Sequence, residues 1–275
     1  MLRKYNEQRT IGDNLKLGVL SAFAAGMTNV AALVLFFSFA SNITGHFAIL
    51  ASEIANGKWY QVAVVFLWVF LFLLGSFISN LFVIHGDKRR RLLNHALPLT
   101  MEILCLVGVG YYGHFHYTET LMETELLVAL LLFAMGLQNG LTASISNFAV
   151  KTTHLTGLTT DLAIHLSMAT KKFWREKPEV RQKLVLLTSI AVAYIAGGIV
   201  AGSITSHFQY KVFFFIASLL SGVLLYDVVR NGLSVRSQPS GARRALRTRT
   251  TRSEGPEAGQ RLPIPRMAPE LSSAS

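Results

Sequence analysis

Six long apolar runs divide the sequence, and they constrain the fold more than any other feature. A helix needs about 20 apolar residues to cross the hydrocarbon core of a bilayer, and each run is near that length. The runs lack the period-two alternation of a membrane β-barrel. A soluble all-α protein would have to bury nearly every face of these helices in one small domain. The runs cover residues 17–40, 59–85, 96–113, 125–150, 184–206 and 211–229.

The placement of charge agrees with a multi-pass membrane protein of the all-α class. The sequence is 51% hydrophobic and 15% charged, and of its 26 Lys and Arg residues all but Lys58 and Lys211 fall in alternate connections. Basic residues concentrate on the cytoplasmic side of a membrane, so we expect both termini to be cytoplasmic. Anionic lipids at that face account for the excess charge without nucleic acid as a partner. The basic segments are residues 1–16, 86–95, 151–183 and 230–275.

The strongest polar interruption is the stretch Met135–Asp161, MGLQNGLTASISNFAVKTTHLTGLTTD. It begins inside the fourth apolar run, where Gln138, Asn139 and Asn147 are predicted to lie on the helix. It then leaves through a Thr-Gly-Leu-Thr-Thr-Asp segment, which we interpret as a turn. Amides at membrane depth must find a partner or line a wet cavity.

A weaker copy lies about 110 residues earlier in the chain, as Gly26-x-x-Asn29 followed by Thr44-Gly45. Each half of the chain, about 17–113 and 125–229, contains three of the apolar runs. An odd number of crossings makes the second half enter from the opposite side, so the sequence predicts two inverted three-helix repeats.

The short segment 44–57 is predicted to be a re-entrant or interfacial half-helix with Thr44 as its N-cap. If it crossed the membrane, the basic cluster at 88–91 would lie outside, against the charge pattern. Broken helices at matched positions are typical of secondary transporters, because the free N–H groups of a half-helix can hold an anionic or polar group. The candidate substrate-binding residues are Asn29, Thr44, Gly45, Gln138, Asn139, Thr156, Gly157 and Asp161.

Other polar residues carry weaker signals. Glu102 lies in the third run, where a carboxylate is either functional or solvated near the interface. Asp161 either complements a helix N-terminus or contacts a ligand. Asp161 and His165 supply only two potential metal ligands, so neither a metal nor a cofactor is predicted. Residues 162–177 suit the membrane surface, and the Arg-rich tail 230–275 is predicted to be disordered.

The same motifs carry a family resemblance. FAMGLQNGLTASISNFAVKTTHLTGLTTDL, with AAGMTNVAAL and SNITGHFAILA in the first half, resembles the YoaK-like family of bacterial inner-membrane proteins, a domain of unknown function. The resemblance covers about residues 15–230 and implies a polytopic inner-membrane protein of about six helices with no established activity. The family pattern usually has Asp at Asn29 and Asn at His46, so the charge that an ion-coupled mechanism would use at position 29 is absent.

Three function classes remain open. The leading hypothesis is a permease-like transporter of a small polar or anionic solute. The alternative is a non-transporting membrane scaffold or sensor that uses its glycine faces to bind other helices and its tail as a cytoplasmic contact. An intramembrane enzyme is the weakest hypothesis, because the sequence has no nucleophile elbow, zinc-protease or phosphate-loop motif. We therefore do not expect an enzyme.

Overall fold

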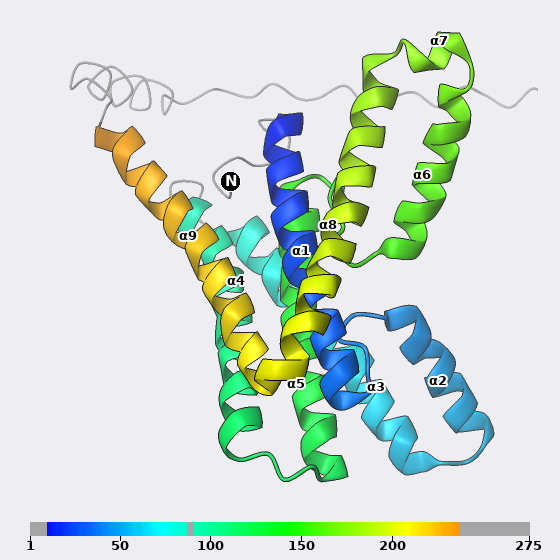
Figure 1. The fold of residues 1–275 in the computed structure, drawn as a ribbon, viewed down its shortest axis with the longest axis vertical. Coiled ribbons are helices and arrows are strands. Elements are labelled where there is room, and N and C mark those ends of the chain that lie inside the picture. Colours follow the sequence, from blue (N-terminus) through cyan, green and yellow to red (C-terminus); the bar gives the residue numbers. More distant parts are fainter. Residues whose placement is uncertain (1–9, 87–90, 237–275) are drawn as a thin grey trace, which may run out of the picture. The chain divides into compact units, whose positions relative to one another are not determined.

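The computed structural model describes residues 10–86 and 91–236, and this part of the chain is helical and contains no strand (Figure 1). The chain divides into two units, Met1–Asn231 and Gly232–Ser275, and the core and the helix contacts lie within the first. The predicted tail lies outside the described residues from residue 237 onward. The elements are α1 (Ile11–Phe36), α2 (Ile43–Ala55), α3 (Trp59–His85), α4 (Arg91–Phe115), α5 (Leu121–Ile145), α6 (Leu155–Ala169), α7 (Lys172–Arg175), α8 (Pro178–Phe208), η3 (Gln209–Lys211) and α9 (Val212–Arg236).

Five helical segments of the described residues are long and apolar enough to cross a membrane, as a multi-pass membrane protein requires. Four of them are α1, α3, α4 and α5. The fifth is the continuous stretch Pro178–Val229, which is 52 residues long and contains α8, η3 and the start of α9. The chain reverses within this stretch at Gln209, whose φ of 46° lies in the left-handed region.

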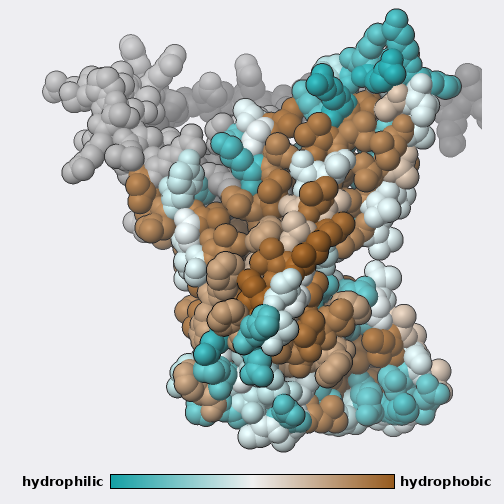
Figure 2. Space-filling view, viewed as in Figure 1, coloured by the Kyte–Doolittle hydropathy of each residue, from teal (hydrophilic) through white to brown (hydrophobic). Residues whose placement is uncertain are grey.

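The surface of this unit is apolar between two polar ends. Phe66, Phe70, Leu73 and Phe77 of α3 are exposed although they are large and hydrophobic. Figure 2 shows hydrophobic side chains over the middle of the unit and hydrophilic ones gathered at both ends. Such a belt is costly in water but natural against lipid tails.

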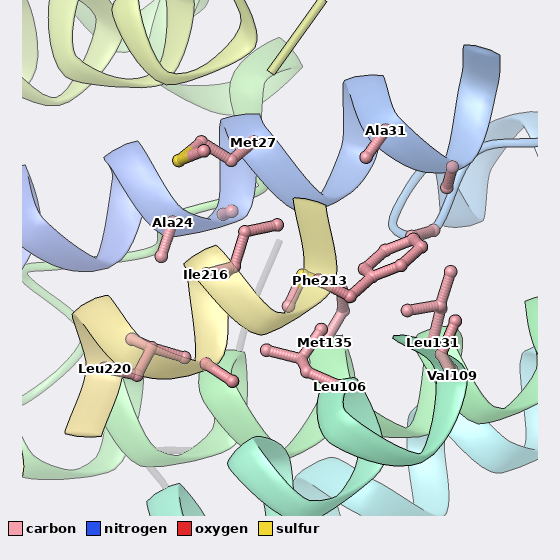
Figure 3. Close-up of a cluster of buried hydrophobic side chains, with 14 of the residues drawn as sticks. Ala24, Met27, Ala31, Leu106, Val109, Leu131, Met135, Phe213, Ile216 and Leu220 are labelled. Atoms are coloured by element: carbon pink, nitrogen blue, oxygen red, sulfur yellow. The ribbon is translucent and has the colours of Figure 1, made fainter. Parts of the chain in front are cut away.

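The main core lies where α1, α4, α5 and α9 meet. Met27 of α1, Met135 of α5 and Phe213 of α9 are fully buried there (Figure 3). Leu106 of α4 completes the contact from the fourth helix. These helices carry apolar residues on all sides, because one face meets the core and the other meets lipid.

Two helix pairs make the most extensive contacts, α1 with α8 and α3 with α5. Members of each pair run in the same direction, and the two pairs run in opposite directions to each other (Figure 1). A Cβ atom at Gly26 would clash with the carbonyl oxygen of Tyr194, and one at Gly136 would clash with that of Phe72. The missing side chains at these two glycines therefore allow the backbones of the paired helices to pack closely.

Several predicted helix bounds were wrong by half a turn to two turns. The first helix begins at Ile11 inside the predicted polar lead, because Thr10 and Asp13 form a capping box. It ends at Phe36, and Phe37 terminates it in the left-handed region. Asn147 is not helical, because α5 ends at Ile145 and Asn147 has a φ of 53°.

The helix predicted after each polar motif is present, but its start was misplaced. The half-helix α2 has 13 residues, and its N-cap is Asn42, not Thr44, since the Asn42 side chain accepts from the Gly45 N–H. The segment interpreted as a Thr-Gly-Leu-Thr-Thr-Asp turn is the first two turns of α6. The predicted surface helix at 162–177 is interrupted after Ala169, and α7 forms a separate turn.

Candidate functional site

A cavity of about 960 Å³ lies among α1, α2, α3, α5, α6 and α8. Figure 2 shows the surface hollowed between α2 and α6. Of the eight predicted binding residues, Asn29, Thr44, Asn139 and Thr156 line this cavity. The pairs come from matched positions of the two halves, Asn29 with Asn139 and Thr44 with Thr156.

The other four predicted residues do not line the cavity. Gly45 and Gly157 lie in the first turns of α2 and α6, directly behind Asn42 and His154. Their lack of a side chain leaves room for those residues, since a Cβ atom at Gly157 would clash with the His154 ring. The remaining two, Gln138 and Asp161, lie respectively inside the helix bundle and on the exposed side of α6.

Asn29 joins α1 to α8 and to the start of α2. Its side-chain nitrogen donates to the Tyr194 hydroxyl at 2.7 Å. Its side-chain oxygen accepts from the Ser41 hydroxyl at 3.1 Å. Both partners also line the cavity, so the amide is held in one orientation at its wall.

Asn139 makes the corresponding connection in the second half. Its nitrogen donates to the Thr153 hydroxyl at 2.5 Å and to the Met135 carbonyl at 3.0 Å. Its oxygen accepts from the Thr152 hydroxyl at 3.2 Å. Thr153 follows Asn139 by 14 residues, as Ser41 follows Asn29 by 12, so each amide ties its helix to the segment before a half-helix.

A further polar contact closes the wall between α3 and α5. The Ser144 hydroxyl donates to the side-chain oxygen of Asn80 at 2.7 Å, and both residues line the cavity. Ser76, one turn before Asn80, donates to the Gly136 carbonyl at 3.0 Å. The cavity thus offers amides and hydroxyls from both helix pairs.

The N-terminal ends of α2 and α6 meet at the cavity and the two helices lead away from it in opposite directions (Figure 1). The first turn of α6 has no side-chain cap, so its backbone N–H groups remain available to a ligand. Both ends carry partial positive charge. Lys151 lines the same cavity, and the lining contains no Asp or Glu. Among the described lining residues, the electrostatics therefore favour an anionic or neutral polar ligand over a cation.

His46 supports the cavity from behind. It is buried, its Nε2 lies 2.9 Å from the Phe39 carbonyl oxygen, and its ring packs edge-on against Trp68. Desolvation lowers the pKa of His46, and the hydrogen bond to Phe39 partly opposes this shift. A neutral ring here positions the loop before α2 without adding charge to the site.

Sequence reasoning missed Tyr194, Lys151 and Asn80. The backbone contacts place Gly197 in the position of Gly75 and therefore Tyr194 in the position of Phe72, a match that depends on the helix crossings. No pattern pointed to Asn80 or Lys151, whose proximity to the cavity depends on how the helices cross. Within the described residues, no group of three or more His, Cys, Asp or Glu side chains could hold a metal ion.

Comparison with protein families gives a match over most of the chain. The family model DUF1275, described as a protein of unknown function, matches residues 17–226 and so covers most of the chain. The chain belongs to the DUF1275 family. The match begins within α1 and ends within α9. The matched region therefore contains the residues that line the cavity, the helices α2 and α6, and most of each candidate membrane span. No curated protein and no solved structure matches the chain.

Proposed function

We propose that this DUF1275 protein is a permease that binds a small anionic or polar solute in the cavity between α2 and α6. The observation that carries the proposal is the cavity of about 960 Å³ at which the N-terminal ends of two half-helices meet. Binding sites of this kind, built from discontinuous helices at the boundary between two repeats, are typical of secondary transporters. Among the residues predicted from sequence, Asn29, Thr44, Asn139 and Thr156 are proposed to contact the solute.

An inverted repeat of three spans per half is part of the proposal. Gly26 packs on the Tyr194 carbonyl and Gly197 on that of Phe23; in the other pair Gly136 packs on Phe72 and Gly75 on Phe133. These contacts are related residue by residue when α1 is matched to α5 and α8 to α3. The two pairs also point in opposite directions. Each close helix pair therefore contains one helix from the first half and one from the second. This arrangement suits a rocking motion of the α1–α8 pair against the α3–α5 pair.

The sixth span is inferred from the reversal at Gln209. A continuous helix of 52 residues would be about 78 Å long, far more than the roughly 30 Å of a hydrocarbon core. With the reversal, α8 and α9 have 31 and 25 residues, and each is long enough to cross once. The start of α1, the turn at α7 and the start of α8 lie at one end of the unit. These are basic segments, which supports a bacterial inner-membrane protein with both termini in the cytoplasm.

The chemistry of the solute is bounded by the lining. Lys151 and the uncapped N-terminus of α6 favour a negative group. The amides and hydroxyls around Asn29 and Asn139 suit additional hydrogen-bonding groups on the same solute. Phe72 and Phe148 supply apolar walls. A small organic acid with hydroxyl or amide groups fits these features best.

The scaffold hypothesis loses its main support in this fold. Gly75, Gly136 and Gly198, which belong to the glycine faces that would have bound other helices, make close contacts within the chain. A sensor would bind the solute without transporting it, so only a measurement of solute flux distinguishes a sensor from a permease.

Uptake by purified protein in proteoliposomes tests the proposal. A panel of small organic acids and neutral polyols is first screened by thermal shift, and the stabilising compounds are then used as radiolabelled substrates. Asn139→Ala is expected to lower uptake at least about tenfold, because a hydrogen bond to a charged solute group is worth about 1.5 kcal/mol or more. Asp161→Ala is the matched control, since Asp161 is exposed and outside the cavity.

The outcomes separate the hypotheses. Binding and uptake that depend on Asn139 and not on Asp161 support the permease. Binding without uptake identifies a sensor. If no compound of the panel binds, or if the two variants behave alike, the proposed solute site is rejected.

A further inference from the structure

A second, much smaller void lies inside the bundle, away from the large cavity. It has a volume of about 20 Å³ and is bounded by α1, α4, α5 and α9. Glu102 of α4 and Gln138 of α5 line it, and Glu102 is 0% exposed. Both carboxyl oxygens of Glu102 and the side-chain nitrogen of Gln138 lack a hydrogen-bond partner among the described residues. The sequence alternative of a solvated Glu102 is therefore wrong.

Among the described residues that line the void, none gives Glu102 a counter-charge. Leu17, Leu20, Leu99, Leu141, Leu220 and Val223 form most of the wall, and Ser21 and Thr142 are its other polar members. Cys105, three residues further along α4, is a titratable neighbour that interacts electrostatically with Glu102. His95 of α4 and Asp227 of α9 are also buried but do not line the void. An ionised carboxylate in such a place costs many kcal/mol, which favours the protonated acid.

A chain of hydrogen-bonding groups leads from this void to the solute cavity. The Thr152 hydroxyl lies 3.5 Å from the side-chain oxygen of Gln138 and 3.2 Å from that of Asn139. Asn139 in turn donates to Thr153, and both line the large cavity. Thr152 itself is 0% exposed.

Thr152 lies within reach of both side-chain amides as a shared donor. A hydroxyl has one hydrogen, so Thr152 can donate to Gln138 or to Asn139 at a given moment but not fully to both. A solute that engages the Asn139 amide changes which of the two acceptors is free. Without the Thr152 donor, the Gln138 amide beside Glu102 is free to reorient.

We propose that Glu102 is a proton-binding site whose occupancy is coupled to the solute cavity through Gln138, Thr152 and Asn139. The inference rests on the proposed function for the identity of the cavity ligand. The chemical step is reversible loss of the carboxyl proton to water, which leaves a carboxylate, and its return. Because coupling between two binding equilibria is reciprocal, solute binding and proton binding alter each other by the same factor. The protein is then a proton-coupled permease.

Infrared difference spectroscopy of the purified protein between low and high pH, with no solute present, tests the proton site. Wild type is expected to show the C=O band of a protonated buried carboxylic acid at neutral pH, and Glu102→Gln to lose it. Glu102→Gln is nearly isosteric with the neutral acid, so the fold is retained. Asp161→Asn, which removes an exposed carboxyl, is the matched control and should keep the band. Glu102→Asp retains an acid and should move the band. A band that persists in Glu102→Gln, or that is absent from wild type, overturns the proton site.

The coupling is tested by the pH at which the same band titrates. Thr152→Val keeps the shape and removes the hydroxyl, and is expected to shift the titration by about half a pH unit or more, as loss of one hydrogen bond would. Thr159→Val is the control, because the Thr159 hydroxyl bonds only within exposed α6. An unchanged titration in Thr152→Val overturns the coupling. An intact Glu102 band in a protein that takes up no solute rejects the permease alone, whereas uptake without this band rejects the proton site alone.

Discussion

The side-chain nitrogen of Asn29 donates to the hydroxyl of Tyr194 at 2.7 Å, across 165 residues of sequence. The bond fastens α1 to α8 at the level of the cavity, where the adjacent Gly26 lets the backbones approach. The matched helix pair has Phe72 in place of Tyr194. This wall of the cavity is therefore polar at Tyr194 and apolar at Phe72.

Tyr194→Phe makes the two walls alike and leaves the Asn29 amide without its acceptor. We expect a loss of about 1 kcal/mol in stability and a severalfold loss of solute affinity, because a buried amide is left unpaired. Thermal unfolding in detergent and thermal shift with the best solute measure the two effects. Tyr111→Phe, on an exposed face of α4, should change neither. Equal effects of the two substitutions would contradict the role given to Tyr194.

Gly26→Ala and Gly136→Ala should each destabilise the protein by about 1–3 kcal/mol, because the new methyl group meets a backbone carbonyl that cannot move aside. Unfolding temperature in detergent measures this. Gly222→Ala is the matched control, since nothing lies within 4 Å of a Cβ atom at Gly222. It should be neutral or slightly stabilising, as alanine favours a helix over glycine. A stable Gly26→Ala variant would contradict the close crossing of α1 and α8.

Lys151→Gln should weaken binding of an anionic solute about tenfold and should have little effect on a neutral one. The lysine is the only Lys or Arg that lines the cavity within the described residues, and a charge-assisted contact contributes about 1.5–3 kcal/mol. Affinity measured at two ionic strengths tests the electrostatic origin. Lys171→Gln, an exposed lysine outside the cavity, is the control. If the two variants bind equally well, Lys151 does not contact the solute.

Single cysteines at Thr44 and Thr156 should react with a small hydrophilic maleimide, and bound solute should protect both. Cys105 is replaced by Ser in the parent protein to remove its thiol. Asp161→Cys in the same parent should react whether or not solute is present, because Asp161 lies on the exposed side of α6. Protection of only one cavity position would place the solute in one half, and protection of neither would contradict the shared site.

Much of the architecture could be predicted from sequence because it depends on local chemistry. The third helix was predicted at 59–85 and is observed at Trp59–His85. The prediction succeeded because the apolar run is uninterrupted and is flanked by Lys58 and Gly86, which cap the helix. Predictions failed where a single side chain sets a helix start. Asn42 and Thr44 are both good N-caps, and only the path of the loop after Phe37 decides between them.

The candidate site divides in the same way. Asn29 and Asn139 could be found because they repeat with the same spacing from a glycine, and the structure places both at the cavity wall. Gln138 was predicted to line the binding site together with Asn139. It lines the small void with Glu102 instead, because successive helical residues point about 100° apart. No local signal shows which of two neighbouring amides faces which space.

The sequence alone determined that the chain is helical and that its helices are long and apolar enough for a membrane, because hydrocarbon penalises every unpaired polar group. It also determined the positions of the two similar polar motifs. The tertiary structure decided that α1 pairs with α8 and α3 with α5, and thereby which side chains share a cavity. Those pairings rest on backbone approach at Gly26 and Gly136, which is a property of two surfaces together and is encoded in neither helix by itself.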